Sequence, residues 1–230
     1  MQPGQDPAVP SDSADRLRRA WQLRPRTDYV FDFWTAFGWV VLTVGIYAFY
    51  VLYQLVRRSR DHNVRRLEFL DAAASFAWEE AQLRGSAEEL RPYFERIGTG
   101  LESLRQSTRD FRDPVIWLLL SMVSFGVTGI VAAVLLNRDL IAHDAAEVAI
   151  EADLAFAFAR LDRPLVAVAD PERVVGRHNA AGRIVATVAS FGVYGFWWAR
   201  DLMVEGNSHF AANRPFEDEV ASAVQEMLGG

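Results

Sequence analysis

The sequence predicts an all-α membrane protein made of three same-sense repeats, each an apolar membrane-embedded helix followed by an amphipathic helix. Three observations lead to this fold class. One sequence pattern recurs three times without a gap, three long windows lack every charged residue, and apolar residues after these windows recur at helical spacing. No stretch alternates cleanly between apolar and polar residues, so no strand is predicted.

The repeat is anchored on three glycines, each followed seventeen positions later by a histidine. A threonine or serine stands two positions before each glycine, and an aspartate or asparagine stands thirteen positions before it. The chain has four histidines, so three at one offset are hard to attribute to chance. The glycines and histidines are Gly45, Gly126 and Gly192, and His62, His143 and His209.

Composition excludes several classes of protein. The chain has 230 residues, of which 51% are hydrophobic and 12% aromatic, so most of it is too apolar to be disordered. The net charge of −6 argues against nucleic acid as a partner. There is no cysteine, which excludes disulfides and thiolate catalysis. The polar start of the chain does not resemble a cleaved signal peptide.

The three charge-free windows are 33–56, 114–136 and 184–199. The first two have the length of a membrane-spanning helix, which needs about 20 residues. The third is shorter. Three such runs in a small chain would overfill a soluble core, so membrane insertion is the favoured interpretation.

Each window either crosses the membrane once or bends at its glycine and returns. One crossing per repeat would place His143 on the opposite side from the other two histidines, whereas a bend keeps all three together. Glycine tolerates the backbone angles of a bend, and the nearby hydroxyl groups could satisfy the freed backbone. The glycines could instead form a close-packing helix face. The short third window favours a broken or re-entrant helix, and both alternatives stay open for the others.

The chain divides into six segments, whose amphipathic parts show apolar residues at three- and four-residue steps. The basic segment near the start is expected to lie on a membrane surface. In chain order the segments are a disordered tail (1–14), a basic amphipathic segment (15–30), repeat 1 (31–84), an inserted soluble helix (85–112), repeat 2 (113–169) and repeat 3 (170–230).

A short motif around the repeat glycines has a known likeness. The stretch 42–50 reads LTVGIYAFY, 190–198 reads SFGVYGFWW, and 124–129 is a degenerate copy. These stretches resemble the T-L-G-I-Y-x-x-Y-W signature of an uncharacterised family of small bacterial integral-membrane domains. The resemblance implies a bacterial inner-membrane location, with most polar segments cytoplasmic, and it brings no activity with it.

No catalytic motif is present, so the chain is not expected to be an enzyme or to hold a cofactor. The one chemical constellation is the histidine triplet. Three imidazoles brought together could bind zinc or another divalent ion, or sense pH. The favoured alternative is structural, with each histidine at the headgroup boundary. The residues Asp32, Asp113 and Asn179, thirteen before each glycine, are predicted to be helix N-caps.

Two functions remain. The first is a membrane-embedded scaffold or accessory protein whose cytoplasmic amphipathic helices bind a partner or a second copy. The alternative is a small-solute channel or transporter subunit, in which the histidines could form a metal or pH-sensing site; this class usually carries polar groups at membrane depth. The bilayer itself is the expected partner, with anionic headgroups near a cluster of arginines. These are Arg57, Arg58, Arg60, Arg65 and Arg66.

Overall fold

The computed structural model describes residues 12–167 and 178–229, and this part of the chain is all-helical, without a strand. The helices are α1 (Asp12–Thr27), α2 (Phe33–Leu42), α3 (Ile46–Leu83), α4 (Ala87–Arg109), α5 (Pro114–Val123), α6 (Val127–Arg160), α7 (Ala180–Ala189) and α8 (Val193–Gly229).

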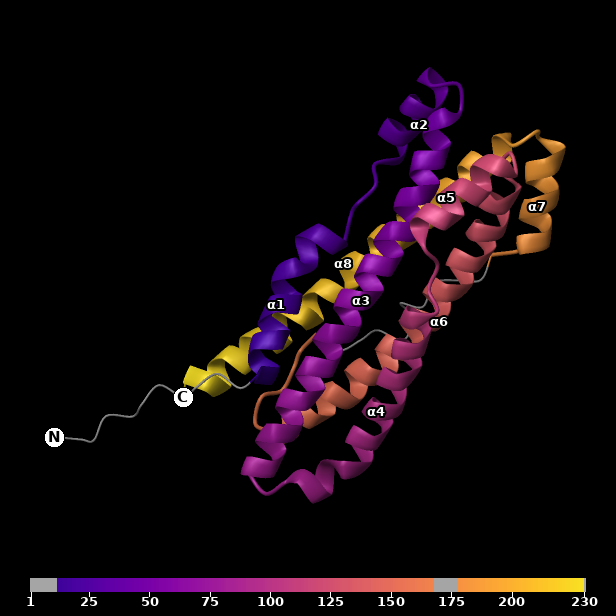
Figure 1. Ribbon diagram of the computed structural model, residues 1–230. Helices are drawn as coiled ribbons and strands as arrows, with labels where there is room; N and C mark the ends of the chain where they lie inside the picture. The colour runs from indigo at the N-terminus through magenta and orange to yellow at the C-terminus, as the bar shows by residue number, and fades with distance from the viewer. Residues whose placement is uncertain (1–11, 168–177, 230) are drawn as a thin grey trace.

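Each repeat folds as a helical hairpin with one short and one long arm. The pairs are α2 with α3, α5 with α6, and α7 with α8. The three long helices contact one another, and the three bends lie at the same end of the molecule (Figure 1). At the other end, α1 packs on α3 and α8, while α4 packs on α3 and α6.

The bends have the same backbone geometry in all three repeats. Gly45, Gly126 and Gly192 have φ of +89°, +90° and +92°, in the left-handed region that glycine adopts without strain. The N–H of each glycine donates to the carbonyl five residues earlier, as at the C-terminus of many helices. No atom lies within 4 Å of where a Cβ would stand on any of them. The glycines therefore form bends and not a packing face.

Side chains on both sides of each bend satisfy the helix ends. Asp32, Asp113 and Asn179 accept backbone N–H bonds at the start of the short arms, which confirms the predicted N-caps. The hydroxyls of the repeat accept from the first turn of the long arms. These bonds run from Tyr47 N to Thr43 Oγ1 (2.9 Å), from Thr128 N to Ser124 Oγ (3.0 Å) and from Tyr194 N to Ser190 Oγ (2.8 Å).

The prediction of membrane-embedded helices long enough to cross a membrane is wrong, and with it the location as an integral inner-membrane protein. Within residues 12–167 and 178–229, no helix combines the length and the apolar character that a crossing requires. The reason is the bend. The windows 33–56 and 114–136 each contribute a ten-residue arm and the first turns of a long helix whose remainder is charged.

One segment boundary also differs from the prediction. The tail was predicted for 1–14, but α1 already begins at Asp12; residues 1–11 lie outside the described part, as does the predicted junction at 169 and 170. The segment 15–30 was expected to lie on a membrane, yet its apolar face, including Leu17 and Ala20, is buried against the bundle. The long helices continue through the predicted necks without a break.

The core has two parts. A large cluster joins α1, α3, α4, α6 and α8 at the end away from the bends, and includes Phe69, Phe76 and Phe158. A smaller cluster joins the hairpins and includes Leu55, Leu136 and Leu202, which stand ten residues after their glycines. Between the two clusters lies a layer of buried polar residues.

Candidate functional site

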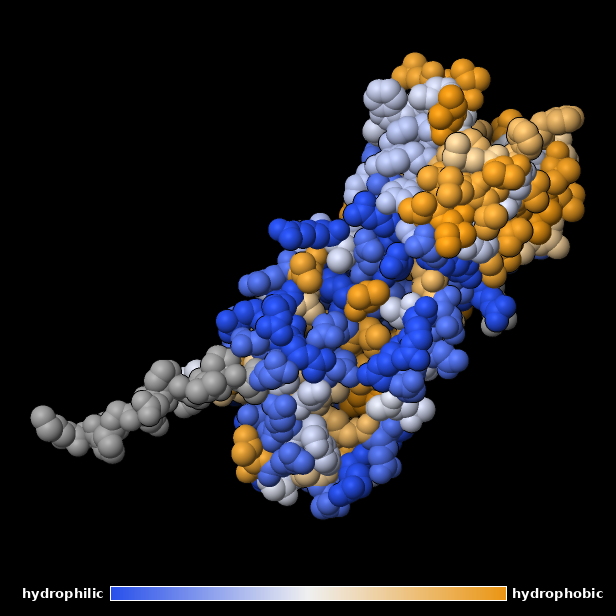
Figure 2. Space-filling view, in the orientation of Figure 1, coloured by the Kyte–Doolittle hydropathy of each residue, from blue (hydrophilic) through white to orange (hydrophobic). Residues whose placement is uncertain are grey.

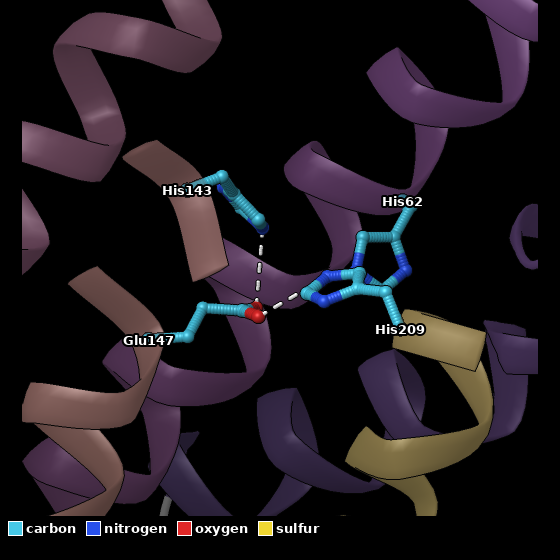
Figure 3. Close-up of side chains that lie close together, drawn as sticks. All are labelled: His62, His143, Glu147 and His209. Atoms are coloured by element: carbon cyan, nitrogen blue, oxygen red, sulfur yellow. Dashed lines mark ion pairs between the residues drawn. The ribbon is translucent and has the colours of Figure 1, made fainter. Parts of the chain in front are cut away.

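The three repeat histidines meet in the middle of the bundle. His62 comes from α3, His143 from α6 and His209 from α8, and all three are buried (Figure 3). Their ring centroids are 5.8 Å (62 to 143), 5.1 Å (62 to 209) and 5.8 Å (143 to 209) apart. The shared offset of seventeen residues from equivalent bends places them at one level of a pseudo-threefold arrangement.

A second polar layer lies one helical turn further along, and sequence analysis missed it. Four residues after the histidines stand Arg66, Glu147 and Asn213, all buried. A further turn brings the buried Glu151 and Glu217. These residues stand at the same offsets, 21 and 25, from the repeat glycines. They differ in type between the repeats, so a search for positions with similar residues in all three repeats does not find them.

Two of the histidines are held by carboxylates. His62 Nδ1 lies 3.0 Å from Asp28 Oδ1, and His209 Nδ1 lies 2.8 Å from Asp144 Oδ1. A carboxylate accepts hydrogen bonds only, so each imidazole carries its proton on Nδ1 when neutral. This tautomer leaves Nε2 of both rings with a lone pair that is available as an acceptor or a ligand.

Glu147 joins the histidine layer to the arginine layer. Its Oε1 lies 3.2 Å from His143 Nε2, and its Oε2 lies 3.3 Å from His209 Nε2 (Figure 3). Arg66 Nε donates to Oε1 at 2.8 Å, and Asn213 Nδ2 donates to Oε2 at 3.2 Å. Arg66 and Asn213 therefore hold the carboxylate of Glu147 in place, and each of its two oxygens faces an imidazole nitrogen of the histidine layer.

Some of the buried nitrogens have no hydrogen-bond partner. His62 Nε2 has none, and neither ring nitrogen of His143 makes a hydrogen bond. The 3.2 Å approach of His143 to Glu147 is an ion-pair distance whose angles do not form such a bond. Buried polar atoms are rarely left in this state, since each unmet group costs about 1–3 kcal/mol.

Burial and neighbouring charges shift the proton affinities here. Burial lowers the pKa of His62 to about 3, against the raising effect of Asp28. Burial alone would raise the pKa of Asp28, but the hydrogen bond and charge of His62, with Arg65, hold it at about 2. Burial opposes ionisation of Glu147 as well, and His143 and Arg66 outweigh it and keep its pKa well below the usual value.

Five carboxylates and three guanidiniums are buried among the described residues. Arg24 lies 3.6 Å from one of these carboxylates but is closer to the exposed Asp218, at 2.7 Å. The acids are Asp28, Asp144, Glu147, Glu151 and Glu217, and the bases are Arg58, Arg65 and Arg66.

The fourth histidine lies elsewhere. His178 Nε2 is 2.5 Å from Glu205 Oε1, and its Nδ1 accepts from Trp198 Nε1 at 3.1 Å. Both ring nitrogens are thus used within a local network near the start of α7. His209 is likewise bonded at both ring nitrogens, to Asp144 and to Asn213, whereas His62 and His143 are not.

The hairpin bends form a different surface. The residue before each bend glycine is apolar and almost fully exposed: Val44 at 92%, Phe125 at 95% and Phe191 at 99%. Figure 2 shows the largest gathering of hydrophobic residues over the ends of the hairpins, while the rest of the visible face is mostly hydrophilic with smaller hydrophobic areas. We call this surface the apolar end. A cavity of about 370 Å³ lies between the hairpins and is lined by residues of all three.

The arginines expected near headgroups separate into two groups. Arg57 and Arg60 are exposed and pair with Asp61 and Asp113. The other three are buried and cannot reach a membrane. Arg65 and Arg66 bind the internal carboxylates, and Arg58 donates to backbone carbonyls of Leu202 and Met203 and to Asn207. Arg58, Arg65 and Arg66 lie on the side of α3 that faces the core, and the exposed Arg57 and Arg60 lie on its other side.

Comparisons with family models, curated proteins and solved structures found no match to this chain. The resemblance to a bacterial membrane-domain family therefore stays a prediction, and function is argued from the residues themselves.

Proposed function

We propose that the protein is a scaffold or accessory protein that docks on one face of a lipid bilayer and does not cross it. The observation that carries the proposal is the set of three apolar side chains at equivalent bends, each more than nine-tenths exposed. Scattered exposed apolar residues are normal, but a contiguous apolar surface marks a binding site. The apolar faces of α1 and α4 are used inside the fold, which leaves the apolar end as the surface for docking.

The length of the hairpins fits one leaflet. A ten-residue arm such as α2 is about 15 Å long, half of the roughly 30 Å hydrocarbon layer. The first charged residues on α3 and α6, Arg57 and Arg138, stand twelve positions after their bends, or about 18 Å. On α8, Arg200 comes after eight positions, and an arginine can extend its head toward water from that depth.

Aromatic residues lie at the intermediate depth. Trp34, Trp39 and Trp197 are half or more exposed, and each stands five to eleven positions from its bend. Tryptophan and tyrosine favour the boundary between hydrocarbon and headgroups because one part of the ring system is apolar and another is polar. The order along the hairpins is therefore aliphatic and phenylalanine tips, then tryptophan, then charge.

The backbone at the tips supports a selected role for these side chains. Val44, Phe125 and Phe191 adopt φ of +50° or +51°, which L-residues other than asparagine and aspartate avoid. A β-branched or bulky residue there is strained, and it is also exposed. Such strain persists where the side chain serves a purpose outside the folding of the chain itself.

The channel alternative has no comparable support. The cavity between the hairpins ends at Leu55, Leu136 and Leu202, which also border the small pocket beside the histidines. These three leucines separate the apolar end from the polar centre. Arg57 and Arg60, the two exposed arginines of the cluster first expected near headgroups, pair with acids, so binding should depend on apolar burial more than on anionic lipid.

The test is vesicle flotation with a variant that removes the tips and keeps the fold. In the triple variant Val44→Asn, Phe125→Asn and Phe191→Asn, asparagine suits the left-handed backbone better than the native residues. We expect the native protein to float with phosphatidylcholine vesicles. The triple variant should bind at least tenfold more weakly, since about 1.5–3 kcal/mol is lost for each large side chain. Its thermal midpoint should be unchanged or higher.

The matched control is Leu83→Asn, which removes an 81% exposed leucine at the far end of α3 and should float like the native protein. Equal flotation of the native protein and the triple variant would contradict the proposal. So would a native dimer, seen by light scattering, that the triple variant abolishes while neither protein binds vesicles. That outcome would assign the apolar end to a second copy of the chain.

A further inference from the structure

We propose that His62, His143, His209 and Glu147 bind one divalent transition-metal ion at the centre of the bundle. One potential ligand atom from each residue lies within 4.8 Å of all the others, and all four residues are buried. The inference is independent of lipid docking, because the cluster lies on the opposite side of the three leucines from the apolar end.

His62 and His209 carry the proton on Nδ1, which is a tautomer that leaves Nε2 free to bind a metal. Metal-binding histidines usually donate their other ring N–H to a carboxylate, which fixes the ring and makes the free nitrogen a better ligand. Asp28 and Asp144 do this for His62 and His209 through Nδ1. The Nε2 atoms are then directed to the centre. His62 Nε2 has no other partner, and His143 has a nitrogen to offer with no hydrogen bond to break.

The spacing needs only small adjustments. A tetrahedral ion with bonds of about 2.0–2.1 Å holds its ligand atoms about 3.3 Å apart. Glu147 Oε1 already lies 3.2 Å from His143 Nε2, and the other oxygen, Oε2, lies 3.3 Å from His209 Nε2. The remaining separations, up to 4.8 Å, can close by rotation of the imidazoles. Arg66 and Asn213 hold the carboxylate in place during that change.

A divalent ion would satisfy the buried ring nitrogens of His62 and His143 that make no hydrogen bond. These rings bind a metal in their neutral state. A pocket of about 30 Å³ lies beside His62 and extends to the partly exposed Ser59 and Asp139.

The donor set restricts the class of ion. Three imidazoles and one carboxylate suit zinc and other first-row transition metals, and not calcium or magnesium, which prefer oxygen ligands. With four protein ligands in a closed, buried site, the ion would have a structural role. It would tie α3, α6 and α8 together at the level where the histidines meet.

The first experiment uses the native protein and Zn²⁺ alone. Protein stripped with EDTA is desalted, given Zn²⁺ at pH 7.5, desalted again and analysed for metal. We expect close to one zinc per chain. At a free concentration one hundred times the dissociation constant, the thermal midpoint should rise by about 5–10 °C, and EDTA should reverse the rise. Co²⁺ in place of zinc should give the visible absorption of a four-coordinate site.

Variants assign the ligands. His143→Gln is the first choice, because His143 makes no hydrogen bond whose loss would disturb the fold. It should keep its helical circular dichroism and lose the zinc, the cobalt spectrum and the thermal rise. The matched control is His178→Gln, which removes a histidine paired with Glu205 outside the cluster. It should bind zinc like the native protein.

Three results would overturn the proposal. The first is native protein with less than a tenth of a zinc per chain and no thermal shift. The second is zinc binding that survives His143→Gln but is lost in His178→Gln. The third is a metal-free protein whose thermal midpoint rises as the pH falls from 7 to 5.5 and ignores zinc, since protons on the histidines would then be balancing the carboxylates.

Discussion

The apolar end and the polar centre are built from the same three helices in opposite ways. At the apolar end, large apolar side chains point outward around a cavity. About three turns beyond the leucine layer, charged side chains point inward and are almost fully buried. A globular protein normally reverses both arrangements. The difference shows that the centre is stabilised by internal pairing, whereas the side chains of the apolar end make few contacts within the chain, as the proposed docking requires.

The largest loss of stability should come from substitution of Arg66, which disrupts the buried ion pairs of the polar centre. Its guanidinium binds Glu147, Glu151 and Glu217, and Arg66→Met leaves three buried carboxylates without it. We expect a loss of about 3–5 kcal/mol in the free energy of unfolding, measured by urea titration, as found when one member of a buried ion network is removed. The control Arg91→Met, which removes an exposed pair with Glu88, should not change the midpoint measurably.

Acid should weaken the same region of the metal-free protein. The pKa of His62 is lowered to about 3, so between pH 6.5 and 3 the unfolded chain takes up a proton that the folded chain does not. The pKa of Asp28 is lowered to about 2, so its contribution, about 2 kcal/mol, is present above pH 4 and is lost between pH 4 and 2.

Stability in EDTA should therefore fall steadily as the pH drops below 6.5. Urea midpoints across pH 3 to 8 measure this slope. The variant His62→Gln cannot take up a proton, so its slope between pH 6.5 and 4 should be shallower than that of the native protein. An identical slope in the two proteins would show that His62 is not the group responsible.

The bends should show a smaller effect that distinguishes them from ordinary helix positions. Gly192→Ala places a Cβ on a residue with φ of +92° and should destabilise by roughly 1 kcal/mol. Gly38→Ala, inside α2 with open space around it, should stabilise by up to about 1 kcal/mol, because alanine is the better helix former. Thermal denaturation of the two variants measures both. If both variants changed the thermal midpoint in the same direction, the positive φ of Gly192 would not explain why glycine is needed there.

The smallest change in stability should come from substitution of one of the exposed residues before the bend glycines. Phe125→Asn alone relieves backbone strain and removes no internal contact of an almost fully exposed ring. We expect a change of a few tenths of a kcal/mol at most, in the stabilising direction. A clear destabilisation in calorimetry would mean that the ring packs within the protein, and that the two ends differ less than described.

Much of the local structure could be predicted from the sequence. Aspartate and asparagine directly before an apolar helix commonly act as N-caps, as they do at Asp32, Asp113 and Asn179. The hydroxyl groups near the bends likewise accept backbone N–H bonds at the start of the long helices. The offset of seventeen brought the histidines to one level because equivalent helices start from equivalent bends. The choice between crossing and bending was not encoded in the same way. Window length counts apolar residues and says nothing about the direction of the chain after Gly45 or Gly126.

The polar centre was harder to predict for a different reason. Arg66, Glu147 and Asn213 occupy one repeat position but have complementary charges, and they are recognised as a set only when the helices are placed side by side. In sequence, the arginines around Arg66 look like a basic surface cluster. Likewise, the apolar stripe of α1 did not reveal whether a membrane or the bundle would cover it.

The divergence of the repeats at the centre has a consequence for how such a fold could arise. Three identical repeats assembled as separate chains would place three arginines, three glutamates or three asparagines at the level where Arg66 meets Glu147. Like charges at that distance in a dry interior would repel one another strongly. Joining the repeats in one polypeptide lets each copy specialise, so a positive, a negative and a neutral residue share one level. We therefore expect that replacing the second and third repeats with copies of the first would be tolerated at the bends but not at this level.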